Sequence, residues 1–171
     1  MTKIRLIISL VILTLAVHAG FAQNGKSSKP EDKAAFGNGT HLLEQDPFNQ
    51  KAKEISKSLL VFIIVAQDVP INLCTDFLTP IGKKYRYSPE TTGQFTFGMG
   101  AFIIEHPDKA NDAKAVFQGG LESVSKMYEA MLKQKADAKN EFLDSLVEKR
   151  NKGEVGQIVD DILSKGGCKS K

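Results

Sequence analysis

The chain has 171 residues, of which 42% are hydrophobic and 25% are charged, and its formal net charge is +3. A length of this size suits one domain with a single hydrophobic core. A charge this small gives no whole-protein field of the kind that steers proteins to nucleic acid, so we expect no nucleic-acid partner, although local charged patches remain compatible with it.

Residues 1–22 have the three parts of a secretory signal peptide. Lys3 and Arg5 supply the positive start, residues 6–17 are apolar apart from two hydroxyl side chains, and small residues precede position 23. The apolar stretch is shorter than the roughly 20 residues of a transmembrane helix, so we predict cleavage and no remaining anchor. Cleavage removes two basic residues and no acidic one, which lowers the net charge to +1. The expected location is the periplasm or the medium.

Residues 23–46 are rich in Gly, Ser, Lys and Asn and hold few large apolar side chains. Burial of so few apolar side chains gains too little free energy to offset the conformational entropy that is lost when the segment becomes ordered. We therefore predict a flexible leader over residues 23–46, followed by a single helical domain over residues 47–171.

The first predicted helix starts at Asp46-Pro47, an acidic cap followed by proline. Apolar residues then recur at helical spacing up to Ala66, and every residue from 59 to 66 is apolar. The β-branched residues of this run also suit a buried strand. The length of the element favours a buried helix at the centre of the core.

A second, short helix is predicted over residues 70–78, followed by a connection over residues 81–87. Ser88-Pro89 then opens a third helix, which runs to about Glu105 and ends at His106-Pro107 because proline disfavours a helical residue before it.

Three glycines lie inside this third helix: Gly93, Gly98 and Gly100. Each costs up to about 1 kcal/mol relative to alanine, so some compensating role is expected. Close packing against another helix is the simpler explanation. The alternative is a ligand cavity beside phenylalanines of the same helix, which are Phe95, Phe97 and Phe102.

The clearest amphipathic pattern runs from Val116 to Leu132 and resumes at Phe142, either as a separate helix or through residues 133–139. A last helix follows the break at Gly153 and ends at a glycine pair before Cys168. The predicted fold is all-α, an irregular bundle of five or six helices.

Cys74 and Cys168 are separated by 94 positions and are expected to form a disulfide, since an isolated pair outside the cytoplasm is normally oxidised. The chain-entropy model assigns such a link up to about 4 to 5 kcal/mol of stabilisation. No Cys-x-x-Cys spacing is present to lower a thiol pKa, so a structural role is favoured over a redox role.

The sequence from Cys74 to Leu78 resembles the Cys-x-Asp-Phe-Leu segment that opens the small helical periplasmic acid-stress chaperones. Those proteins are shorter and also have two bridged cysteines, but with a much narrower spacing. The resemblance covers five residues, and it carries over no functional residue.

No catalytic, phosphate-binding, dinucleotide-binding or calcium-binding motif is present, and we predict no cofactor and no metal site. Glu105, His106 and Asp108 are the nearest approach to a catalytic or metal-binding cluster. Neighbouring residues on a helix point in different directions, so a solvated helix end is the favoured interpretation.

One predicted loop interleaves three cations with two tyrosines: Lys83, Lys84, Tyr85, Arg86 and Tyr87. Tyrosine and arginine are enriched at binding hot spots, so these residues are candidates for partner binding. In the alternative interpretation the tyrosines pack onto the core and the cations stay solvated.

These observations favour an exported helical protein that binds a protein or a cell-envelope component. Two alternatives stay open. One is a small hydrolase or metal-dependent enzyme that uses Glu105, His106 and Asp108. The other is a periplasmic stress chaperone or a carrier of a small apolar ligand.

Overall fold

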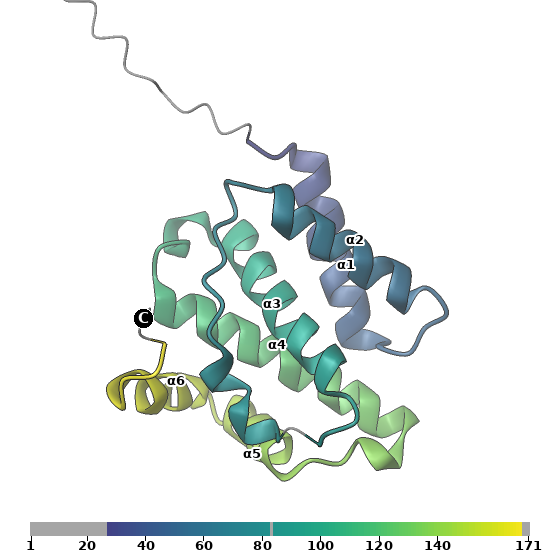
Figure 1. Ribbon diagram of the computed structural model, residues 1–171, viewed down its shortest axis with the longest axis vertical. Coiled ribbons are helices and arrows are strands. Elements are labelled where there is room, and N and C mark those ends of the chain that lie inside the picture. Colours follow the sequence, from purple (N-terminus) through teal and green to yellow (C-terminus); the bar gives the residue numbers. More distant parts are fainter. Residues whose placement is uncertain (1–26, 83, 169–171) are drawn as a thin grey trace, which may run out of the picture.

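The computed structural model describes residues 27–82 and 84–168; the predicted signal peptide and Lys83 lie outside this part. The described chain contains helices and no strand, which confirms the all-α prediction (Figure 1). Its α-helices are α1 (Pro30–Gln45), α2 (Ala52–Val65), α3 (Ser88–Glu105), α4 (Ala113–Gln134), α5 (Glu141–Asn151) and α6 (Val155–Ser164). Short 3-10 helices span Thr75–Phe77, Thr79–Ile81, Pro107–Lys109 and Ala136–Ala138.

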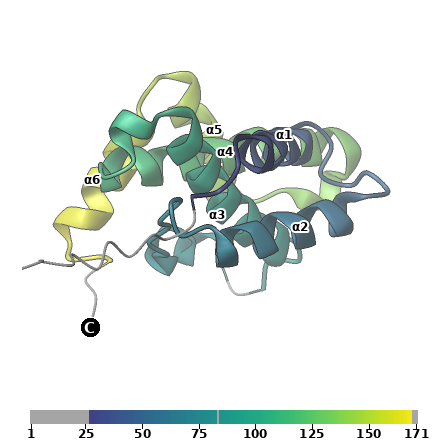
Figure 2. The same ribbon diagram turned by 90° about the horizontal axis from the view of Figure 1, so that it is seen from above.

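Helices α3 and α4 form an antiparallel pair at the centre of the molecule, with α1 and α2 on one side and α6 on the other (Figures 1 and 2). Their backbones cross closely at Gly98, where an added Cβ would lie 2.3 Å from the Ser123 Cβ and 3.2 Å from the Gly120 Cα. Gly100 is equally constrained, because its Cβ would lie 2.8 Å from the Phe36 ring. Close packing therefore explains two of the three glycines of α3.

The predicted flexible leader is wrong for residues 30–45, which form α1. Pro30 opens the helix, and two acidic residues in the first turn favour its N-terminus. Phe36 and Leu43 are buried against α2 and α3, and Gly39 lets α2 approach, since an added Cβ would lie 3.0 Å from Leu59. Two well-placed apolar side chains thus order a segment whose composition is polar.

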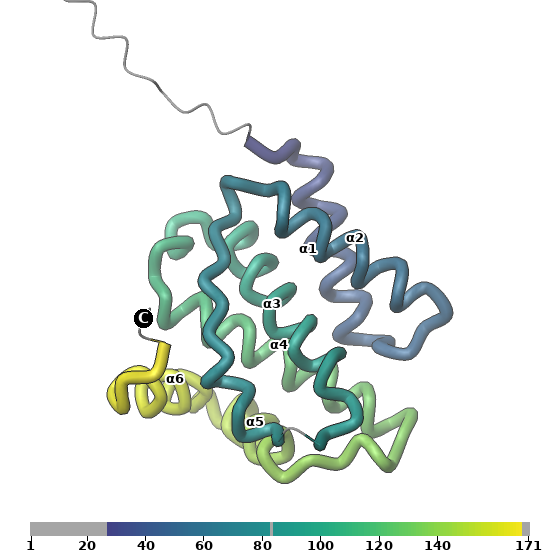
Figure 3. Tube along the Cα trace, in the orientation of Figure 1, coloured from purple at the N-terminus to yellow at the C-terminus, as the bar shows by residue number. Residues whose placement is uncertain are grey.

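Two other boundaries differ from the predictions. Helix α2 begins at Ala52, five residues after Pro47, which is buried in the preceding turn. The predicted helix over residues 70–78 is an extended segment that crosses α3 and α4 and leads into two 3-10 turns (Figure 3). Of the two alternatives for the segment after Leu132, the structure shows separate helices: residues 135–140 lie between α4 and α5, and the Asn140 side chain caps α5 by accepting from the Leu143 N–H at 3.1 Å.

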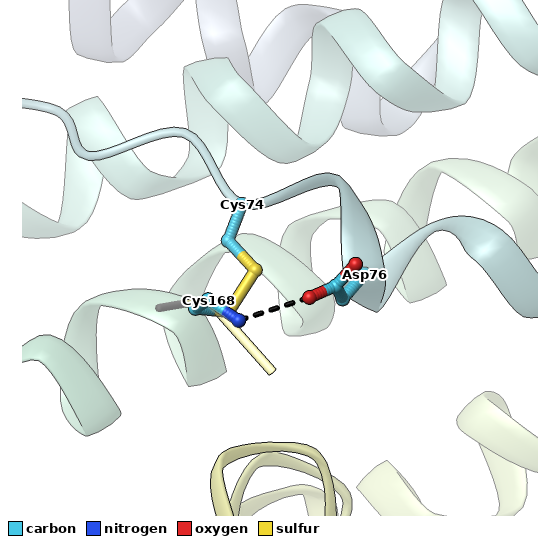
Figure 4. Close-up of side chains that lie close together, drawn as sticks. All are labelled: Cys74, Asp76 and Cys168. Carbon is cyan, nitrogen blue, oxygen red and sulfur yellow. Dashed lines mark hydrogen bonds between the residues drawn. A yellow bond between two sulfur atoms is a disulfide. The ribbon is translucent and has the colours of Figure 1, made fainter. Parts of the chain in front are cut away.

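Cys74 and Cys168 are joined in a disulfide, with Cα atoms 5.3 Å apart, as the sequence predicts. The link ties the chain after α6 to the extended segment between α2 and α3. The Cys168 N–H also donates to the Asp76 carboxylate at 2.9 Å (Figure 4). The end of the final helix is therefore held at two neighbouring points.

Candidate functional site

A groove of about 590 Å³ runs between α2 and α3. Side chains of α2 at positions 56, 57, 60, 63 and 64 form one wall, because this spacing places them on one face of the helix. The opposite wall comes from α3 and includes Gly93, Thr96 and Phe97. Leu43 and Met127 add apolar surface from α1 and α4.

Gly93 lines this groove and adds no side chain to it. A Cβ at this position would approach only the Phe97 ring, at 3.4 Å, which is ordinary contact. Gly93 is thus unlike Gly98 and Gly100, where an added Cβ would collide with a neighbouring helix. The alternative of a cavity beside the phenylalanines of this helix is met in part, because Phe97 lines the groove whereas Phe95 and Phe102 do not.

The groove continues along an exposed apolar surface, which we call the α2 crest. Its side chains are between 50% and 72% exposed, and they are Leu60, Val61, Ile64, Val65 and Leu73. The prediction of a fully buried helix is wrong here, because Leu59 is the sole buried residue of α2. Clustered apolar side chains in water are typical of an interaction or ligand-binding surface.

A second pocket of about 650 Å³ adjoins the groove and shares four lining residues with it, namely Pro47, Ser56, Pro89 and Glu90. It is more polar than the groove, since Lys53 and Lys135 line it. The Lys135 ammonium lies 4.4 Å from the centre of the Phe48 ring, a cation–π contact.

A buried polar network lies beneath the groove and connects α1, α3 and α4. The Gln94 side chain, which is 1% exposed, donates through Nε2 to the Ser123 Oγ at 2.7 Å and to the Thr40 carbonyl at 3.3 Å. The Ser123 hydroxyl in turn donates to the Glu44 Oε1 at 2.6 Å. Buried groups of this kind need partners, so the network fixes the relative positions of the three helices.

His41 lies between two carboxylates from two helices. Its Nδ1 is 3.0 Å from the Glu44 Oε2, and its Nε2 is 2.7 Å from the Glu105 Oε1. Burial opposes protonation, but the hydrogen bonds and charges of the two carboxylates outweigh it and raise the pKa of His41 above its usual value. Sequence reasoning placed His41 in a flexible leader and missed this contact, because Glu105 is 64 positions away.

The two tyrosines of the predicted partner-binding loop form hydrogen bonds within the protein. The Tyr85 hydroxyl donates to the Ala138 carbonyl at 2.7 Å, and the Tyr87 hydroxyl donates to Asp137 at 2.9 Å. Arg86 also forms an ion pair with Asp137 at 3.0 Å. Burial raises the pKa of Tyr85, as expected for a phenol held away from water. The tyrosines thus follow the alternative interpretation; Lys84 is exposed, Lys83 is outside the described residues, and a partner role for the loop stays a prediction.

Glu105, His106 and Asp108, the candidate cluster of the enzyme alternative, are exposed and do not come together as a metal-binding group, in line with the favoured solvated helix end. Glu105 pairs with His41, whereas the His106 ring packs on the Phe102 ring with centres 4.7 Å apart. Within the described ranges, the one group at metal-binding distance is Cys74, Asp76 and Cys168 (Figure 4). Its two sulfurs are bonded to each other, so they are not thiolate ligands in this state.

None of the helices in residues 27–82 and 84–168 is long and apolar enough to cross a membrane. Comparison with protein-family models, curated proteins and solved structures gave no match to this chain.

Proposed function

We propose that this protein is an exported binding protein that takes an apolar component of the cell envelope into the groove between α2 and α3. The groove itself carries the proposal: its volume of about 590 Å³ lies within the usual range of small-ligand sites, and apolar side chains line most of it. Export is inferred from the predicted signal peptide, and the disulfide supports it.

The energetic argument rests on the α2 crest. Each apolar side chain exposed there is in contact with water, and burial of apolar surface is favourable by roughly 25 cal/mol per Å². Leu60, Ile64 and Leu73 line the groove and would gain this burial if a ligand filled it, whereas Val61 and Val65 do not line it. An apolar run that the fold leaves half exposed is therefore consistent with a surface that a ligand covers.

A comparable argument for catalysis is weaker. A hydrolase needs a nucleophile and a base within reach of a substrate. Ser123 and Glu44 are hydrogen-bonded to each other, but both are buried in the network under the groove. Their arrangement serves the packing of α1 against α4.

The proposal is tested with a substitution at Gly93 that fills the groove. Gly93 lines the groove and a Cβ at this position meets only the Phe97 ring, so we expect the larger side chain of Gly93→Leu to occupy the groove and displace a bound ligand. We expect the affinity for the neutral fluorescent probe N-phenyl-1-naphthylamine to fall by at least about tenfold, the equivalent of 1.4 kcal/mol.

The matched control is Val61→Leu, which adds one methylene group on the α2 crest at a position that does not line the groove. Its probe affinity is expected to equal that of the unmodified protein. The proposal fails if Gly93→Leu remains folded, as judged by its thermal unfolding, and binds the probe as tightly as the control does.

A further inference from the structure

The groove has two chemically different ends. At one end the lining is apolar, with Ile64, Leu73 and Phe97 facing the space. At the other end the groove passes Pro47 and Pro89 and joins the second pocket, since both residues line both spaces. A ligand that fills both spaces lies in a hydrocarbon environment at one end and in a polar environment at the other.

The polar end is cationic. Lys57 lines the groove, and Lys53 and Lys135 line the adjoining pocket, whereas Glu90 is the one carboxylate that lines either space. In the described part of the chain, none of the three lysines forms an ion pair with a carboxylate. The side chains at this end therefore carry a net charge of +2 that the protein does not neutralise by direct pairing.

The distance between the two ends is comparable to the length of an extended hydrocarbon chain. Lys53 and Ile64 are eleven residues apart in α2, which corresponds to about 16 Å along the helix axis. Between them the groove is bordered by Leu60 of α2 on one side and by Gly93 of α3 on the other. This shape suits one hydrocarbon chain with one polar head.

We propose that the ligand is a single-chain anionic amphiphile of the fatty-acid class, with its carboxylate among Lys53, Lys57 and Lys135 and its hydrocarbon chain between α2 and α3. This inference rests on the proposed function and adds the chemistry of the head group. Lysine presents a compact point charge, which attracts a monoanionic head without demanding a bidentate geometry, and lysines are the cations that line the two spaces.

The test compares three ligands that share a twelve-carbon chain and differ in charge: laurate, dodecanol and dodecylammonium. Each displaces the neutral probe from the full mature chain at concentrations below those at which it forms micelles. Laurate is expected to bind at least about fivefold more tightly than dodecanol, and dodecylammonium more weakly than either. Added salt should reduce the advantage of laurate, since exposed charges are screened.

Two triple variants test whether these three lysines cause the charge dependence of ligand binding. Replacement of Lys53, Lys57 and Lys135 by Gln should abolish the preference for laurate over dodecanol. The control replaces three exposed lysines that line neither space by Gln: Lys109, Lys133 and Lys139. Both variants lose three positive charges, so only a local effect separates them.

The outcomes distinguish the two claims. Equal binding of laurate and dodecanol, with both blocked by Gly93→Leu, would overturn the carboxylate inference and leave the groove in place. Tighter binding of dodecylammonium, or an equal loss in the two triple variants, would also overturn it. Displacement of the probe by none of the three ligands would overturn the proposed function as well.

Discussion

At the scale of single residues, His41 has the most constrained environment. Both ring nitrogens contact carboxylate oxygens, and both can donate only when the imidazole is protonated. Protonated His41 therefore links α1 to the last residue of α3, and neutral His41 leaves one carboxylate without its donor. Glu44 keeps Ser123 and Lys126 as partners in either state.

This environment predicts a pH-dependent stability. Because the pKa of His41 is raised in the folded protein, its contribution is fully present below the unfolded value near 6.5 and is lost as the pH rises through the folded value. The free energy of unfolding in urea should therefore fall as the pH rises from about 6.5 through the raised folded pKa of His41. In His41→Gln, which retains one donor, the fall should be smaller; an identical fall in both proteins would contradict the assignment.

Gly98 and Gly93 give a matched pair of substitutions in one helix. Gly98→Ala forces a Cβ against Ser123 and should lower the free energy of unfolding by about 1 to 3 kcal/mol. Gly93→Ala meets only the Phe97 ring and should leave stability unchanged or raise it by up to about 1 kcal/mol, through helix propensity. Urea unfolding of both variants measures the difference, and equal effects would contradict the close crossing of α3 and α4.

At the scale of elements, the helix with the best local signals was predicted best. Ser88-Pro89 and His106-Pro107 bracket α3, and the structure places its ends at Ser88 and Glu105. These signals are local, since they depend on the backbone preferences of proline and its neighbour. The contacts of α1 are not local, and only the position of Phe36 and Leu43 against other helices explains its order.

Helix α2 shows the opposite error. Its run of apolar residues was interpreted as buried, but hydrophobic pattern alone does not say how many neighbours surround a helix. The structure covers one face of α2 with α1 and α3 and leaves Ile64 and Val65 exposed. The surplus of apolar residues, together with the unexplained Gly93 in α3, is the signal from which the groove could have been inferred.

The disulfide is expected to stabilise the folded protein by holding the chain end that follows α6. Cys74→Ser combined with Cys168→Ser releases the chain end after this helix, and the free energy of unfolding should fall by about 2 to 5 kcal/mol. Urea unfolding of the double variant gives the value. The single Asp76→Ala variant removes only the hydrogen bond from the Cys168 N–H and serves as the control, with a smaller loss. A double variant as stable as the unmodified protein would show that the link is dispensable.

At the scale of the whole molecule, the bundle divides into a well-packed part and an open part. Helices α3, α4, α5 and α6 share the largest core cluster, which the disulfide adjoins. Helix α2 forms the outer wall of the groove and is the least buried of the α-helices that border it. A ligand would therefore lie between α3, which is firmly packed, and α2, which is more exposed.

Amide NMR of the isotope-labelled mature chain, titrated with laurate, tests this account most directly. The account predicts that the signals that shift belong to the groove, with Gly93, Thr96 and the C-terminal half of α2 affected most, and that signals of α5 and α6 stay in place. Shifts centred on α5 and α6, or no shifts at any laurate concentration below micelle formation, would contradict it.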